Sequence, residues 1–265
     1  METNEKQNLN QNFLETVENS FNTFINVGGT SRKPAKLKPL HGTIAKNIAD
    51  MLGEDYIVMS QGYGKGKEAK LTGATHDKQI DITIQNKHTK EFVAVIEVKY
   101  VMQNYKQNAI NYFETMRGAT ENIRLTGVPC FQVFIVPDRL PYFTSEKGKG
   151  KKIKHWEEFN GHNAEKYIKL SNFNPDKVFG IPDNTLLYVV HVTPEIDKQT
   201  VTTNIEYLDF YRNNTPTIEL SKNVYPGFNP NGSVIYNDYE KFMNKVYNTI
   251  ISKKYADFDI NLYKI

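Results

Sequence analysis

The amino-acid sequence predicts a protein of the α/β (α+β) class. Short runs in which apolar residues dominate or alternate with polar ones are typical of strands, and other segments have apolar residues at the three- and four-residue spacing of helices. The two kinds of segment follow one another along the chain. With 265 residues, of which 39% are hydrophobic and 24% are charged, the chain can bury the full core of a globular protein.

Four segments are predicted to be helical. The first lies within residues 1–39 and ends at Gly28-Gly29, and the second ends at Gly53. The third follows Tyr100 and is expected to end at Gly118, and the fourth covers Tyr239 to Lys254. Their apolar faces are formed by Phe13, Val17, Phe21 and Phe24; by Ile44, Ile48, Met51 and Leu52; by Tyr105, Ala109, Tyr112, Phe113 and Met116; and by Phe242, Val246, Ile250 and Ile251.

Six segments are predicted to be strands. In Gln79 to Ile84 every second residue is isoleucine, and Phe92 to Tyr100 is an apolar run interrupted only by Glu97 and Lys99. The other four are Tyr56 to Ser60, Cys130 to Val136, Leu186 to Val192 and Thr200 to Tyr211. The last of these alternates between apolar and polar residues.

The strands predicted at Gln79 to Ile84 and at Phe92 to Tyr100 carry the most informative residues of the chain. Side chains of a strand alternate between the two faces of a sheet, so a hairpin buries one set and leaves the other. The buried set is expected to be Ile80, Ile82, Ile84, Phe92, Ala94, Ile96 and Val98, and the opposite set is Asp81, Val95, Glu97 and Lys99. Asp81 then lies opposite Val95 or Glu97, so its Cβ atom is about 5 to 8 Å from that of Glu97.

Two carboxylates at that distance can share one divalent cation. Without such a cation they would repel each other, and one of them would tend to take up a proton. Oxygen ligands that leave room for water and for a phosphate oxygen suit Mg²⁺. The predicted ligands are therefore Asp81, Glu97 and the carbonyl group of Val98, while Lys99 is placed to hold a phosphate or the attacking water.

A purely structural interpretation is that Glu97 and Lys99 form an ion pair at the solvent edge of an ordinary strand. The pattern Glu-x-Lys is weak evidence alone, since the chain has a second copy, Glu68-Ala69-Lys70, with no apolar strand before it. The apolar run Phe92 to Ile96 that precedes Glu97 distinguishes the first copy. Charges at the end of such a run are costly to bury unless they are paired or bind a metal, which favours the metal site.

Asp81 followed by Glu97-Val98-Lys99 resembles the motif of the PD-(D/E)xK nuclease superfamily, and within it the Type II restriction endonucleases. Ile80 stands where the motif's name has proline. The resemblance covers about Leu40 to Phe143, and the segment Asn104 to Glu114 is similar to the helix that follows Glu-x-Lys in several restriction enzymes. It implies a restriction-endonuclease-like core with a central mixed β-sheet flanked by helices, and Asp81, Glu97 and Lys99 as catalytic residues.

The resemblance also implies a function and a division of the chain. Residues 1–39 are expected to form an N-terminal helical arm and basic connector and residues 40–143 the catalytic core. Residues 144–265 are expected to form a C-terminal elaboration that completes the fold and carries DNA-recognition loops. The expected activity is that of a Type II restriction endonuclease, a homodimer that hydrolyses double-stranded DNA with Mg²⁺ at a short specific sequence. The alternatives are a structure-specific repair or junction-resolving nuclease with the same site, and a non-catalytic DNA-binding protein.

Basic clusters suggest where DNA would lie, because the net charge of +3 is too small to decide it. Five lysines around two glycines predict a flexible loop that contacts phosphates, and the helix after Tyr100 has a polar stripe that includes Asn104 and Asn108. The lysines are Lys147, Lys149, Lys151, Lys152 and Lys154. The alternative without DNA contact is that the loop and the polar helix face are simply exposed to solvent.

The remaining sequence features limit other functions. No apolar run has the length of a membrane span, and the first residues do not resemble a signal peptide, so a cytoplasmic protein is expected. The single cysteine, Cys130, starts an apolar run and is interpreted as a buried structural thiol, which excludes a cysteine-based zinc site. The six histidines are scattered, and surface or core positions are expected for them.

Overall fold

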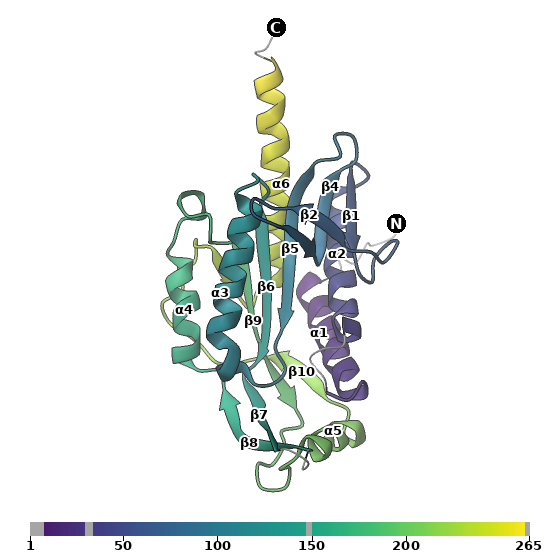
Figure 1. Cartoon of the computed structure of the whole chain (residues 1–265), viewed down its shortest axis with the longest axis vertical. Helices are drawn as coiled ribbons and strands as arrows, with labels where there is room; N and C mark the ends of the chain where they lie inside the picture. Colours follow the sequence, from purple (N-terminus) through teal and green to yellow (C-terminus); the bar gives the residue numbers. More distant parts are fainter. Residues whose placement is uncertain (1–7, 30–33, 147–149, 263–265) are drawn as a thin grey trace, which may run out of the picture.

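A computed structural model of the chain describes residues 8–29, 34–146 and 150–262. It confirms the predicted class, since a central mixed sheet of seven strands is flanked by helices (Figure 1). Six strands follow one another in the order β1-β4-β5-β6-β9-β10, and β11 pairs with β9. The pairs β1·β4, β4·β5 and β9·β10 are antiparallel, whereas β5·β6, β6·β9 and β9·β11 are parallel.

The bounds of the sheet strands are β1 Tyr56–Ser60, β4 Ile82–Asn86, β5 Phe92–Tyr100, β6 Cys130–Pro137, β9 Asn184–Thr193, β10 Thr217–Leu220 and β11 Val234–Tyr236. Two hairpins lie outside the sheet: β2 Ala69–Thr72 with β3 Asp77–Ile80, and β7 Arg139–Glu146 with β8 Gly150–Glu158. The helices are α1 Leu9–Asn26, α2 Lys38–Leu52, α3 Tyr105–Arg124, α4 Gly161–Ser171, α5 Asn204–Asn213 and α6 Tyr239–Leu262. Two short 3₁₀ helices are η1 Pro34–Lys36 and η2 Pro175–Lys177.

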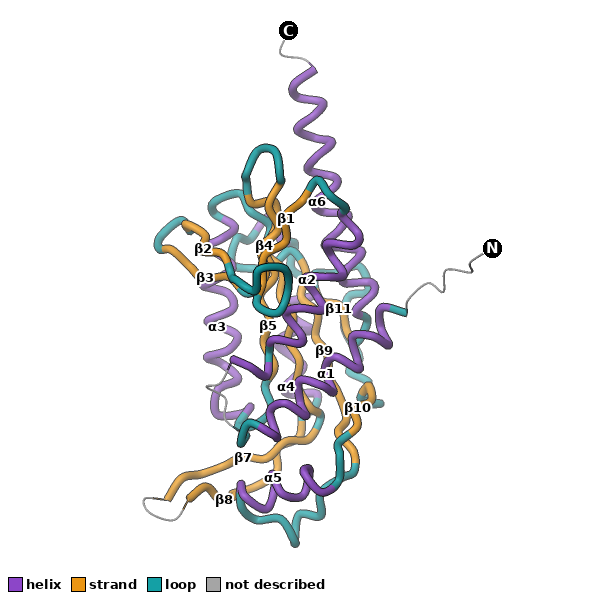
Figure 2. The backbone as a smooth tube through the Cα atoms, turned by 90° about the vertical axis from the view of Figure 1, so that its right-hand side faces the viewer, coloured by secondary structure: helices purple, strands orange, loops and turns teal. Residues whose placement is uncertain are grey.

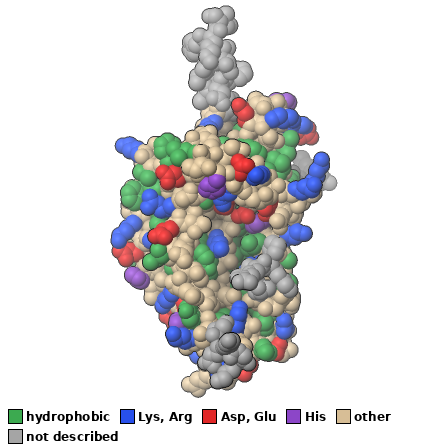
Figure 3. Space-filling model, viewed as in Figure 1, with side chains coloured by type: hydrophobic (Ala, Val, Ile, Leu, Met, Phe, Trp, Pro, Cys, Tyr) green, Lys and Arg blue, Asp and Glu red, His purple; other side chains and the backbone are tan. Residues whose placement is uncertain are grey.

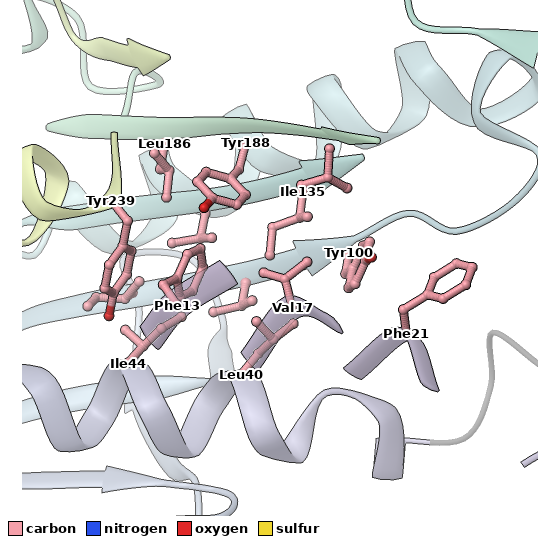
Figure 4. Packing of buried hydrophobic residues seen from close by; sticks show 14 of the residues in the cluster. Phe13, Val17, Phe21, Leu40, Ile44, Tyr100, Ile135, Leu186, Tyr188 and Tyr239 are labelled. Carbon is pink, nitrogen blue, oxygen red and sulfur yellow. The ribbon is translucent and has the colours of Figure 1, made fainter. Parts of the chain in front are cut away.

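The helices cover both faces of the sheet, which makes three layers (Figure 2). Helices α1, α2 and α6 pack with Ile82, Ile96 and other strand residues in the main core. Figure 4 shows how α1 and α2 meet the sheet in this core, where the Phe13 ring stacks on Tyr239 at 3.8 Å between centroids. Helices α3 and α4 bury a second core on the opposite face. The far end of α6 projects beyond the sheet (Figure 1).

Several predicted elements are confirmed at their predicted positions. Strand β1 has the predicted bounds, and α2 ends at Gly53, whose φ of 72° lies in the left-handed region that glycine tolerates best. The strands predicted at Cys130 and Leu186 are β6 and β9, and the helix predicted at Tyr239 is α6, which extends to Leu262. Cys130 is buried, as predicted.

Two predictions about individual elements are wrong. Residues 204–213 form helix α5 and not a strand, because Thr203 and Glu206 build a capping box that starts a helix. Helix α3 does not end at Gly118 but continues to Arg124. Glycine in a helix interior costs only about 1 kcal/mol, and Arg124 holds the last turn by donating hydrogen bonds to carbonyl groups of the segment 175–181.

The faces of the hairpin are predicted correctly for Ile82, Ile84, Ala94, Ile96 and Val98, which all lie in the main core. The prediction is wrong for two residues. Ile80 packs on the other side of the sheet with Val95, because the chain leaves the sheet at Asp81 and β3 pairs with β2. Phe92 also packs on that side, because a bulge in β5 between the partners of Ile84 and Gln85 reverses the alternation.

Within the described ranges, no helix is both long and apolar enough to cross a membrane.

Candidate active site

The candidate site lies where β3 diverges from the line of β4. Ile82 pairs with Ile96, so a continued strand would place Asp81 opposite Glu97, but β4 begins only after Asp81. The side chain of Asp81 replaces the missing backbone partner, since the N–H group of Val98 donates to Asp81 Oδ2 at 2.8 Å. Ser60 Oγ, at the end of β1, donates to the carbonyl oxygen of Asp81 at 2.8 Å. These two bonds fix Asp81 beside β5.

Glu97 lies on the α3 side of the sheet, mostly buried, with two differently placed carboxylate oxygens. Oε2 accepts a hydrogen bond from Lys78 Nζ on β3 at 2.9 Å. Oε1 is buried and has no hydrogen-bond partner among the residues that the structure describes. Burial, together with the charge of Asp81, raises the pKa of Glu97 to about 7, although the charge of Lys78 opposes both effects.

Lys99 follows Glu97 on the same face at the edge of the site. Its Nζ lies 4.6 Å from the centroid of the Tyr112 ring on α3. Partial burial lowers the pKa of Lys99, and the negative charge of Asp81 opposes this effect. No carboxylate within the described ranges forms an ion pair with Lys99. Its ammonium group is therefore available to an anion.

The carbonyl group of Val98 points to the same gap as Asp81. In an antiparallel pair the N–H and C=O groups of one residue point toward the same neighbouring strand. The N–H group of Val98 is directed to Asp81, whereas the N–H group of Val95 bonds to Pro129 on the opposite side. The direction of the backbone therefore allows the Val98 carbonyl group to be the metal ligand that the sequence predicts.

Two residues that the sequence did not single out as ligands join the site. The possible ligand atoms of His41 on α2, Glu68 before β2 and Asp81 all lie within 4.8 Å of one another. Glu97 does not belong to this group. Glu68 belongs to the second Glu-x-Lys pattern, for which no site was predicted, and His41 was expected to be an ordinary histidine. Their convergence depends on tertiary structure, which no local pattern predicts.

A second lysine, Lys36 of η1, approaches the site from the other side. Its side chain is buried, and Nζ lies 5.3 Å from the centroid of the Phe24 ring. Burial lowers its pKa to about 8, and the positive charge of Lys99 contributes to the shift. Lysine ammonium groups that lie close enough to repel each other favour the approach of an anion such as a phosphate.

The donors present fit a divalent cation. The negative charge of Asp81 contributes to the raised pKa values of Glu68 and Glu97, and Glu97 has a buried oxygen without a partner among the described residues. A cation would relieve the repulsion and satisfy that oxygen. On the face in Figure 3, acidic and histidine side chains lie next to each other just below the β2–β3 hairpin.

The predicted basic loop is in part a strand. Lys151, Lys152 and Lys154 lie on β8 of the β7–β8 hairpin, and Lys147 and Lys149 lie outside the described residues. The prediction of a flexible loop through 150–154 is therefore wrong, because these residues pair with β7. Lys151 and Lys154 are exposed.

The hairpin is fastened to the start of α3. The carboxylate of Glu157, fully buried on β8, accepts hydrogen bonds from the N–H groups of Tyr105 and Lys106 at 2.7 and 3.1 Å. Asn104, predicted to contact DNA, bonds through its side-chain amide to both backbone groups of Phe143. Asn108 donates to the Asn104 carbonyl. In this structure Asn104 therefore holds the hairpin.

No family model, no curated protein and no solved structure matches the chain.

Proposed function

We propose that this protein is a Mg²⁺-dependent endonuclease that hydrolyses phosphodiester bonds of double-stranded DNA, of the restriction type. The observation that carries the proposal is the meeting of Asp81, Glu97, Lys99 and the Val98 carbonyl at one break in the sheet. Carboxylates and a carbonyl group suit Mg²⁺, and a neighbouring lysine without a carboxylate partner in the described ranges suits a phosphate.

The chain's own residues have separable roles in this reaction. Asp81, Glu97 and the Val98 carbonyl would hold Mg²⁺, which when bound supplies charge neutralisation at the scissile phosphate and lowers the pKa of water. Lys99 donates hydrogen bonds to a phosphate oxygen or to the attacking water. The water oxygen forms the new bond to phosphorus as the ester bond breaks, the attacking water gives one proton to solvent, and the leaving oxygen takes up one proton from solvent. Tyr112 limits where the Lys99 ammonium group can move.

The direct test is incubation of the full chain with Mg²⁺ and a large unmodified DNA duplex. Discrete reproducible fragments are the expected result and support restriction. A smear would indicate a nuclease without sequence specificity. An intact duplex together with cleavage of flaps or four-way junctions would favour the structure-specific alternative, and no cleavage of any of these substrates would leave a DNA-binding protein.

The β7–β8 hairpin is expected to contact DNA phosphates through its lysines. Replacing Lys151, Lys152 and Lys154 together by alanine should flatten the slope of log affinity against log salt by roughly 0.9 for each phosphate that the variant no longer neutralises. Affinity for cognate and noncognate duplexes should fall alike, because phosphate contacts do not read sequence. The measurement is a binding isotherm at several salt concentrations.

A control with the same reduction in net charge is the triple replacement of Lys46, Lys169 and Lys241, which are exposed on α2, α4 and α6. It should leave the salt slope unchanged. Equal slopes for the hairpin variant and the wild-type protein would make the hairpin lysines a solubility feature only.

The protein is expected to be a homodimer, because two strands of a duplex must be cut and a two-fold dimer supplies two equivalent sites. Sedimentation equilibrium at micromolar concentration should give about twice the chain mass of 30.5 kDa. A mass of one chain both with and without cognate DNA would contradict the homodimer.

A further inference from the structure

We infer that His41, Glu68 and Asp81 form a binding position for a first-row transition cation such as Mn²⁺, distinct from a cation held by Glu97. The inference deepens the proposed function and rests on it, because Asp81 would be a ligand at both metal positions. Its own content is that an imidazole nitrogen binds the metal directly. An all-oxygen Mg²⁺ site, by contrast, needs no histidine.

The spacing of the three side chains is close to that of a coordination sphere. Their possible ligand atoms lie within 4.8 Å of one another. Ligands at about 2.0 to 2.2 Å from a metal are separated by roughly 3 Å when adjacent and a little over 4 Å when opposite. The observed separations of up to 4.8 Å are therefore only slightly larger than those of ligands on opposite sides of one ion.

His41 is the residue that distinguishes this cluster from an ordinary group of surface acids. The residue is only 3% exposed, and neither ring nitrogen has a hydrogen-bond partner among the described residues. The nearest carboxylate oxygen, Glu68 Oε1, is 3.9 Å from Nδ1, which is too far for a hydrogen bond. Burying such a ring without partners costs free energy, and a metal ion would satisfy one nitrogen.

The charge state of the ring supports metal binding. Burial lowers the pKa of His41, although the negative charge of Asp81 opposes the shift. A neutral imidazole keeps the lone pair that a metal needs. Since His41 Nδ1 and Glu68 Oε1 are 3.9 Å apart, too far for a hydrogen bond, an ion pair between them is the weaker account of their proximity.

The three residues are held in place by separate parts of the backbone. Asp81 is fixed by Val98 and Ser60, as described above. The start of α2 touches the turn after β1 so closely that a Cβ atom on Gly42 would lie 2.6 Å from the carbonyl oxygen of Gly62. The contact holds the start of α2, which carries His41, against the turn from which the chain continues to Glu68.

The donor set favours a transition cation over Mg²⁺. Two carboxylates and one imidazole resemble the mixed nitrogen and oxygen sites of Mn²⁺, Fe²⁺, Co²⁺ and Zn²⁺, whereas Mg²⁺ prefers oxygen and keeps much of its water. Mn²⁺ should therefore bind here more tightly than Mg²⁺. The buried histidine, whose ring has no hydrogen-bond partner in the described ranges, is the reason for the difference.

Pulsed electron paramagnetic resonance of Mn²⁺ bound to the full-length protein, without DNA, tests the inference independently of cleavage. A nitrogen coupling from a directly bound imidazole is expected, and it should change when histidine is labelled with ¹⁵N. This labelling experiment needs no variant, so it remains decisive if a substitution prevents folding. Bound Mn²⁺ without any histidine coupling would overturn the inference, as would no binding of Mn²⁺ at millimolar concentration.

Variants locate the nitrogen. His41→Gln should remove the coupling and weaken Mn²⁺ binding at least tenfold, whereas His162→Gln, at a side chain that is 89% exposed, should change neither. A coupling that survives in folded His41→Gln would contradict the assignment.

Glu97→Gln separates this inference from the proposed function. It should abolish cleavage and keep the nitrogen-coupled Mn²⁺. If wild-type protein shows the histidine coupling but never cleaves DNA, the proposed nuclease function is contradicted and the metal position is supported. If it cleaves DNA while Mn²⁺ is bound only by oxygen, the nuclease function is supported and the metal position is contradicted.

Discussion

Replacing Lys99 by alanine is expected to lower the rate of DNA cleavage with Mg²⁺ by roughly 100- to 1000-fold, the usual reduction for one charged or hydrogen-bonding group in a preorganised site. Its ammonium group contacts the Tyr112 ring and forms no ion pair with a carboxylate in the described ranges, so the substitution breaks no described ion pair. Replacing Lys99 should therefore lower the cleavage rate and leave the free energy of unfolding nearly unchanged. The measurement is single-turnover cleavage of a cognate duplex.

Asp81→Ala and Glu97→Ala should also abolish cleavage, while affinity for cognate DNA survives. Without metal the affinity should rise, because each variant removes a negative charge that repels phosphate. Ca²⁺ should support binding without turnover in the wild-type protein, since its larger, looser coordination sphere positions water poorly.

The chain supplies its own control for these variants. Lys70 ends the second Glu-x-Lys pattern and forms an exposed ion pair with Asp77 at 2.7 Å. Lys70→Ala should cleave at the wild-type rate. If a folded Lys99→Ala or Glu97→Ala variant cleaved DNA as fast as Lys70→Ala does, the proposed active site would have to be abandoned.

Glu97 is also expected to make stability depend on pH in the absence of metal. Its pKa is about 7 in the folded protein and near 4.5 when unfolded. A raised pKa in the folded state means that this group favours folding fully below pH 4.5 and that the contribution is lost as the pH rises through about 7. At about 1.4 kcal/mol per pKa unit, the loss is on the order of 3 kcal/mol at most.

Urea denaturation with a chelator at pH 5 and pH 8 measures this effect. The free energy of unfolding of Glu97→Gln, minus that of the wild-type protein, should increase from pH 5 to pH 8, since glutamine cannot ionise. At pH 8, Mg²⁺ should reduce this difference in free energy of unfolding, because it stabilises the wild-type protein with ionised Glu97. The exposed substitution Glu91→Gln is the control. The same difference at both pH values would show that Glu97 ionises in the folded protein as it does in water.

Local pattern predicted the part of the site that lies on one hairpin. The alternation of apolar residues correctly placed Val98 in the core and Glu97 and Lys99 on the opposite face. It could not show that the strand breaks at Asp81, because the break depends on β3 leaving the sheet to pair with β2. The approach of His41, Glu68, Lys78 and Lys36 has the same non-local origin, since each comes from a different segment.

The failed strand prediction at Thr200 to Tyr211 has a different cause. Apolar and polar residues alternate there, but the capping box of Thr203 and Glu206 favours a helix locally, and Tyr207, Leu208 and Tyr211 then share one buried side. The capping residues are the better signal. The pattern Thr203-x-x-Glu206 therefore predicts the start of α5.

The contact of Glu157 with the first turn of α3 has a practical consequence for anyone who redesigns the protein. The β7–β8 hairpin lies outside the central sheet, but it cannot be deleted without loss. Deleting residues 139–158 would remove the acceptor of two backbone N–H groups of α3 and the hydrogen bonds of the Asn104 side chain to Phe143. Each of these groups that stays buried without a partner costs about 1 to 3 kcal/mol. A shortened hairpin should keep Glu157 and Phe143, so that the first turn of α3 and Asn104 retain their hydrogen-bond partners.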